Sequence, residues 1–175
     1  MANRAYLYSK NRVEIEGWEI PEENYYDSRW DIPLAWWFFF CEKDLQLIKT
    51  QGNNENWEEV KLVAEKNSAI SLFQTRRIIL DNIVKLYLSA SPINTFLETI
   101  NKWPGTYLIL DGEEVLPELD SSGLEHKIRL VKLFHSLDSS LVILSDVIEQ
   151  LCFYSHLSSD NKDNLRGSVV GFTYG

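Results

Sequence analysis

The sequence predicts an α+β fold: a single domain, residues 1–175, in which a small antiparallel sheet packs against four or five helices. Short runs rich in aromatic and β-branched residues occur near both ends of the chain, as is typical of strands. A third such run ends in Asp-Gly, a strong hairpin signal. Between these runs, apolar residues recur at the spacing of helices.

The N-terminal region contains two predicted strands. Residues 3–9, NRAYLYS, place Tyr6 and Tyr8 on one face of a strand and the alanine and leucine on the other. Residues 12–20, RVEIEGWEI, alternate apolar and acidic side chains, which indicates a half-solvated strand. Residues 21–31, PEENYYDSRWD, are predicted to form a loop.

The next segment, residues 32–42, contains five consecutive aromatic residues, 36–40. Pro33 suits the first turn of a short buried helix with Asp31 as its N-cap, and a strand is the alternative. Only ten residues separate Asp31 from Glu42, whereas a membrane-spanning helix needs about 20. Because the run also lacks a polar face, we interpret it as core, with a docking surface as the alternative.

Three helices are predicted in the middle of the chain. Asn56 and Glu59 are spaced as a capping box and predict a helix over residues 57–65. Residues 93–103, INTFLETINKW, predict another short helix. Between them, a longer helix that ends before SASP is predicted by apolar residues at helical spacing: Ile70, Phe73, Ile79, Leu80, Ile83, Val84 and Tyr87.

The last third of the chain completes the predicted sheet. Residues 106–116, TYLILDGEEVL, predict a hairpin with a two-residue Asp-Gly turn. A capping box predicts a helix over residues 122–137, and DSS at residues 138–140 caps another over 141–156. Residues 167–175, GSVVGFTYG, predict a strand that pairs near the N-terminal one. The apolar face expected for the helix over 122–137 consists of Leu124, Ile128, Val131 and Phe134.

Composition excludes several classes of function. A net charge of −9 argues against a nucleic-acid-binding protein, which needs clustered basic residues, and favours a basic partner. The sequence contains no phosphate-binding glycine loop, no GxSxG elbow, no CxxC and no HExxH, so we expect neither a cofactor nor a metal. Cys41 and Cys152 are interpreted as free buried thiols. The three histidines, His126, His135 and His156, are interpreted as residues on helix surfaces or at caps. The N-terminus lacks an apolar signal segment, which indicates a cytoplasmic protein.

The acidic residues are concentrated in two segments. Residues 13–28 contain six acids and residues 103–126 contain six more, and neither segment has a lysine or arginine. If the two segments converge in the fold, they form a patch that steers a basic partner.

The N-terminal sequence MANRAYLYS resembles the start of a family of uncharacterised bacterial proteins that read Met-x-Asn-Arg-x-Tyr-Leu-Tyr, and DIPLAWW extends the resemblance. The resemblance implies a bacterial origin and supplies no catalytic residues.

Two hypotheses of function follow. The first is a non-enzymatic acidic module that binds a basic protein, in the manner of an immunity protein that neutralises a toxin. Tyrosine and tryptophan are favoured interface anchors, and here they alternate with acids. The predicted binding residues are Trp18, Glu22, Glu23, Tyr25, Tyr26, Asp27, Trp30, Glu113 and Glu114. The alternative is a small enzyme with a pocket at the end of the sheet, lined by Arg4, Tyr6, Tyr8, Trp18 and a carboxylate.

Overall fold

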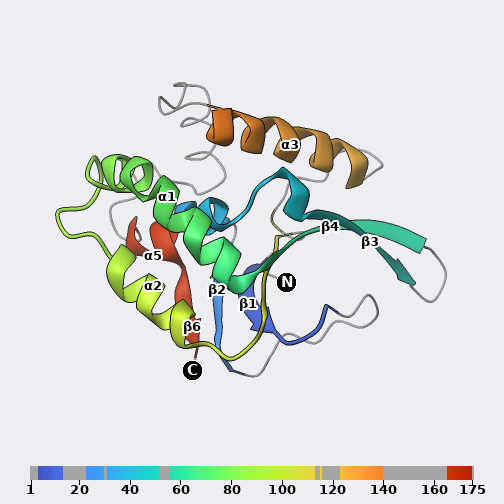
Figure 1. Ribbon diagram of the computed structural model, residues 1–175, viewed down its shortest axis with the longest axis horizontal. Helices are drawn as coiled ribbons and strands as arrows, with labels where there is room; N and C mark the ends of the chain where they lie inside the picture. Colours follow the sequence, from blue (N-terminus) through green and yellow to red (C-terminus); the bar gives the residue numbers. More distant parts are fainter. Residues whose placement is uncertain are drawn as a thin grey trace.

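The computed structural model describes residues 4–13, 23–29, 31–51, 56–112, 115, 123–139 and 165–174. Within them, strands form one antiparallel sheet in the order β3-β4-β5-β1-β2-β6. The strands are β1 (Arg4–Lys10), β2 (Tyr25–Arg29), β3 (Leu45–Gln51), β4 (Asn56–Glu65), β5 (Tyr107–Asp111) and β6 (Phe172–Tyr174). The α-helices are α1 (Lys66–Val84), α2 (Ile93–Lys102), α3 (Gly123–Ser139) and α5 (Leu165–Val170), and the 3-10 helices are η1 (Leu34–Phe39) and η2 (Glu42–Asp44). This combination confirms the predicted α+β class (Figure 1).

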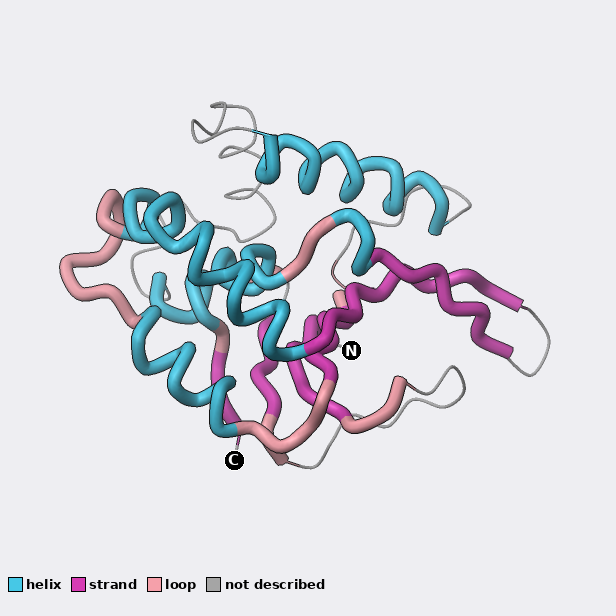
Figure 2. The backbone as a smooth tube through the Cα atoms, in the orientation of Figure 1, coloured by secondary structure: helices cyan, strands magenta, loops and turns pink. Residues whose placement is uncertain are grey.

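The helices meet at η1. Both α1 and α5 pack against η1, and α2 packs beside α1. Helix α3 lies over β3, β4 and η2. Figure 2 shows the hairpin of β3 and β4 projecting away from α1 and α2.

The aromatic run at residues 36–40 forms the centre of the core, and every one of its side chains is 0% exposed. Because a 3-10 helix has three residues per turn, successive side chains of η1 point in three different directions. These side chains contact four helices. Trp36 Nε1 donates to the Val170 carbonyl of α5 at 3.0 Å, and the ring centroids of Trp37 and Phe134 of α3 lie 6.4 Å apart. The Phe73 ring of α1 lies 6.4 Å from that of Phe38 and 4.4 Å from that of Phe39, and Phe39 lies 5.8 Å from Phe96 of α2. The interpretation of this run as core is confirmed.

The start of η1 differs from the prediction over residues 32–42. The helix is a 3-10 helix that begins after Pro33, and no side chain caps it. Asp31, predicted as its N-cap, instead accepts hydrogen bonds from the hydroxyl groups of Ser28 and Ser168, the second at 3.3 Å. One hydroxyl donor three residues away and another from α5 thus satisfy the carboxylate of a residue that is 4% exposed.

The helix predicted over residues 57–65 is wrong, because this segment is β4. Val60, Leu62 and Ala64 enter the core, while Lys61 lies on the opposite face of the sheet. This alternation has the period of a strand, and pairing with both β3 and β5 satisfies its backbone. The capping signal was therefore misleading, and β3 was not predicted at all.

Two further predictions are wrong: the loop over residues 21–31 and the hairpin over residues 106–116. Residues 25–29, inside the loop predicted over 21–31, form β2, which pairs with β1 and β6. The first strand of the hairpin predicted over 106–116 exists as β5, but β1 and β4 occupy both of its edges. A return strand therefore has no edge of β5 to pair with. The Gly112 carbonyl instead accepts a hydrogen bond from the Val115 N–H at 3.0 Å.

The predicted β1, α1, α2, α3 and β6 are confirmed. The buried face of α3 differs from the prediction, since Ile128 is 47% exposed. Among the side chains of α3 that the structure describes, Leu130, Leu133, Phe134 and Leu137 are buried, and the side chain of Leu124 lies outside the description. Residues 167–170, predicted as strand, belong to α5. Of the strand predicted over residues 12–20, residues 14–20 lie outside the described residues, and so does the helix predicted over 141–156.

The structure describes the side chains of one of the two cysteines, Cys41, and one of the three histidines, His135. Cys41 is a free thiol, although it is only half-buried. His135 is exposed on α3, as predicted. Cys152 and His156 lie outside the described residues, as does the side chain of His126. No helix in the described part of the chain is long and apolar enough to cross a membrane.

Arg76 of α1 connects three parts of the core. Its side chain is 4% exposed, its Nη1 donates to the Phe40 carbonyl at 2.5 Å, and its Nη2 pairs with the carboxylate of Asp138 on α3. The neighbouring Arg77 instead pairs with Asp81 on the helix surface, with Nε 3.2 Å from Oδ2.

We predict that Arg76→Met lowers the free energy of unfolding by about 2 kcal/mol, because the Phe40 carbonyl loses its donor and Asp138 loses its cation. Urea denaturation measures the effect. The matched control, Arg77→Met, removes the partly exposed pair with Asp81 and an exposed hydrogen bond to Asn94 of α2, and should lower the same quantity by less than about 1 kcal/mol. Equal losses in the two variants would contradict the role assigned to Arg76.

Candidate functional site

One aspartate from each of the two acidic segments lies beside β1, on opposite sides of the strand. Tyr6 of β1 is paired with Asp27 of β2 on one side and with Asp111 of β5 on the other. Asp111 is in turn paired with Lys61 of β4. Because directly paired residues project from the same face of a sheet, these four side chains form a row on one face. Strand spacing places the Cα atoms of the two aspartates about 10 Å apart.

Each carboxylate in this row is buried and paired with one cation. Arg4 Nη1 lies 2.6 Å from Asp27 Oδ2, and Lys61 Nζ lies 3.1 Å from Asp111 Oδ2. Both aspartate side chains are 3% exposed. A buried carboxylate is strongly disfavoured without such a partner. The two ion pairs therefore allow acidic residues to lie inside this face of the sheet.

Tyrosines occupy the same face beside the row. Tyr8 is buried with Val63 and Ile109, and Tyr6, Tyr25 and Tyr107 pack against this cluster while staying partly exposed. The rings of Tyr6 and Tyr25 have centroids 6.2 Å apart, and Lys10 Nζ lies 5.8 Å from the centroid of the Tyr8 ring. We call the four residues Tyr6, Tyr8, Tyr25 and Tyr107 the tyrosine face.

Residues named in the two different hypotheses of function lie side by side in the structure. Tyr25 and Asp27, predicted to bind a partner, lie beside Arg4, Tyr6 and Tyr8, predicted to line an enzyme pocket. Figure 1 shows the reason, since β2 runs alongside β1.

Not every predicted binding residue is accessible. Glu23 is exposed just before β2. Tyr26 and Asp27 were expected at the surface, and for both this is wrong, because they are 4% and 2% exposed. Tyr26 points into the core, where its ring centroid lies 5.0 Å from that of Phe96 and 5.4 Å from that of Trp103. The other predicted binding residues, Trp18, Glu22, Trp30, Glu113 and Glu114, lie outside the described residues.

Sequence reasoning missed Lys61, Asp111 and Tyr107 as members of this site. Lys61 lies inside the helix predicted over residues 57–65, and Asp111 lies in the predicted Asp-Gly turn. The alternation of VKLVA around Lys61 was the available signal, because it places one polar residue on the face opposite three apolar ones.

The electrostatics of Asp27 are unusual for an ion-paired carboxylate. Burial raises its pKa above the ordinary value of 3.8, and the nearby Arg4 and Arg29 only partly oppose this shift. Among the described residues, no group of histidine, cysteine and acidic side chains is arranged to hold a metal ion. The site is therefore a face of aromatic rings above neutralised carboxylates.

The raised pKa predicts how stability changes with pH. The folded protein keeps the Asp27 proton in a pH range where the unfolded chain has lost it, so the contribution of Asp27 to stability falls as pH rises from 3.8 through its folded pKa. Asp27→Asn removes this titration. The free energy of unfolding of Asp27→Asn, relative to the unmodified protein, should increase across that window in urea denaturation.

Glu65→Gln provides the control with the opposite sign. A hydrogen bond from the Ser68 side chain, together with those from the backbone N–H groups of Ser68 and Asn67 at the start of α1, lowers the pKa of Glu65 below 4.5. Its stabilising contribution is present above pH 4.5 and is lost as pH falls through the folded pKa. The relative stability of Glu65→Gln should therefore decrease with rising pH. The same direction of change in both variants would contradict the raised pKa of Asp27.

Comparison with models of protein families, with curated proteins and with solved structures finds no match. The resemblance of residues 1–9 to a bacterial family stays a prediction. Any role of the tyrosine face has to follow from its own residues.

Proposed function

We propose that this chain is a non-enzymatic, cytoplasmic protein-binding module for a basic partner, and that the tyrosine face is its contact surface. Neutralisation of a toxin is the form of this function that we favour. The observation that carries the proposal is the gathering of the partly exposed Tyr6, Tyr25 and Tyr107 on one face of the sheet.

Partly exposed tyrosines on a strand are suited to binding. Each ring offers a large apolar area and a hydroxyl group, and tyrosine is enriched among residues that dominate interface energies. Packing against Tyr8, Val63 and Ile109 already restricts these rings in the free protein. Less conformational entropy is therefore lost when a partner binds.

Charge supports a basic partner through long-range attraction. The chain carries a net charge of −9, which accelerates encounter with a positively charged protein. Asp27 and Asp111 contribute little to this attraction, since Arg4 and Lys61 neutralise them locally. We therefore expect the net charge to raise the association rate and the tyrosines to determine the lifetime of the complex.

A small enzyme is the second candidate, and one observation favours it. Arg4, Tyr6 and Asp27 form an ionisable cluster, as that hypothesis required, and the pKa of Asp27 is raised as in many acid catalysts. A general acid or base must reach its substrate within hydrogen-bonding distance. With its side chain 3% exposed, Asp27 offers little surface to a substrate, so we rank binding first.

Site-specific photo-crosslinking in the native host tests the proposal. A photoreactive phenylalanine analogue replaces Tyr25 in one variant and Ile78, which is 68% exposed on α1, in the control. We expect the Tyr25 position to crosslink one basic protein in stoichiometric amounts and the Ile78 position to crosslink none. Absence of a specific adduct at Tyr25, or the same adducts at both positions, would contradict the proposal.

The captured protein then allows a quantitative test. Tyr25→Ala should weaken its binding about 30-fold, which corresponds to about 2 kcal/mol for an interface anchor, mostly through a faster dissociation rate. Tyr25→Phe keeps the ring and should change the affinity by less than about five-fold. Surface plasmon resonance at two salt concentrations measures both rates, and the association rate should fall at high salt. Equal effects of the two substitutions would show that the ring is not the anchor.

A further inference from the structure

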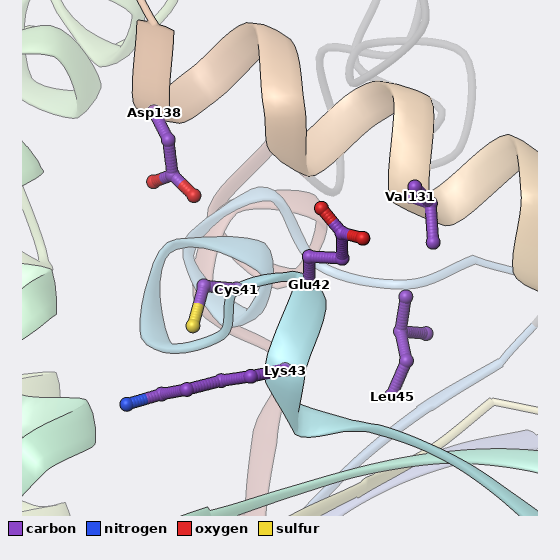
Figure 3. Close-up of a pocket in the computed structure, with 6 residues that line it drawn as sticks. All are labelled: Cys41, Glu42, Lys43, Leu45, Val131 and Asp138. Carbon is purple, nitrogen blue, oxygen red and sulfur yellow. The ribbon is translucent and has the colours of Figure 1, made fainter.

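A pocket of about 500 Å³ lies between α3 and the segment that contains η2 and the start of β3. Its lining residues are Cys41, Glu42, Lys43, Leu45, Val131 and Asp138. Figure 3 shows Asp138 and Val131 extending from α3 toward Glu42 and Leu45 on the opposite wall. This volume is within the range of small-molecule sites.

The walls combine aliphatic surface with carboxylates. Leu45 is buried and Val131 is half-buried, so they supply an apolar wall. The side chains of Glu42 and Asp138 are 47% and 45% exposed and are accessible to a ligand. Figure 3 shows the Lys43 ammonium group directed away from Glu42.

The polar groups at the rim have partners within the protein, but the Glu42 and Asp138 carboxylates keep exposed surface for a ligand. Asp138 accepts from the buried guanidinium of Arg76. Glu42 Oε2 lies 2.9 Å from His135 Nδ1. The Cys41 Sγ donates to Asp44 Oδ2 at 3.1 Å, and burial together with Asp44 raises the pKa of this thiol to about 11. Cys41 is therefore a neutral wall residue at physiological pH and not a nucleophile.

We propose that this pocket binds a small organic cation with a short aliphatic body, of the alkylguanidinium or alkylammonium class. The cationic group lies between Glu42 and Asp138, and the alkyl chain lies against Leu45 and Val131. A guanidinium group suits this position because its planar donors bind carboxylates at two points. The pocket is separate from the tyrosine face and does not depend on the function proposed for it.

Methyl NMR on protein labelled at leucine and valine tests this proposal, with n-butylguanidinium as the probe. Its neutral isostere, n-butylurea, has the same shape without the charge. We expect saturable shifts of the Leu45 and Val131 methyl signals with n-butylguanidinium, and affinity at least ten-fold weaker with n-butylurea. Shifts that do not saturate, or equal binding of the two probes, would overturn the proposal.

Substitution of one carboxylate tests the charge directly. Glu42→Gln should weaken n-butylguanidinium binding at least three-fold. Glu98→Gln, an exposed position on α2, makes the same change in net charge and should leave binding unchanged. Asp138 is not substituted, because its loss would leave the buried Arg76 without its carboxylate. Equal effects of Glu42→Gln and Glu98→Gln would show that binding responds only to the net charge of the protein, and this would overturn the site.

The source of the cation is distinguished by a second probe, N-acetyl-arginine-N-methylamide, which carries a peptide backbone. Binding as tight as that of n-butylguanidinium indicates that an arginine side chain of a protein can enter the pocket. Binding of n-butylguanidinium alone indicates a free small molecule. The proposal requires saturable binding of n-butylguanidinium in either case, and its failure leaves the crosslinking result at Tyr25 unaffected.

Discussion

Five consecutive aromatic side chains without a polar neighbour have to be enclosed on every side, and this constraint determines where the helices lie. The 3-10 geometry of η1 directs the successive side chains of Trp36, Trp37 and Phe38 in three different directions. Each direction is covered by a different helix: α5 for Trp36, α3 for Trp37 and α1 for Phe38. Arg76 closes the end of the run by binding the Phe40 carbonyl. A run with one polar face would have needed only one covering layer.

The sheet holds two acidic side chains inside the protein. Pairing of β1 with both β2 and β5 places Asp27 and Asp111, one from each acidic segment, on either side of Tyr6. These aspartates are tolerated because Arg4 and Lys61 lie within ion-pair distance. The charges available for long-range attraction are consequently those outside these pairs, and the exposed chemistry of the face is aromatic.

The molecule thus has two surfaces of different character. The tyrosine face offers rings above neutralised charge and suits a protein partner. The pocket beneath α3 has accessible carboxylates beside aliphatic walls and suits a small cation. The tyrosine face depends on the pairing of β1 with β5, and the pocket depends on the ion pair between Asp138 of α3 and Arg76 of α1. Both contacts join segments that are far apart in the sequence.

The sequence alone determined the features that depend on local periodicity or on composition. Alternation fixed β1, helical spacing fixed α1 and α2, and the absence of a polar face identified residues 36–40 as core. Only the tertiary structure decided β2 and the neighbours of Tyr6. They depend on pairing between strands far apart in the sequence, such as Tyr6 with Asp111 and Tyr25 with Tyr174, and no local pattern encodes which strands meet. The same reason explains why Tyr26 and Asp27 are buried, since a strand paired on both edges sends alternate side chains to opposite faces.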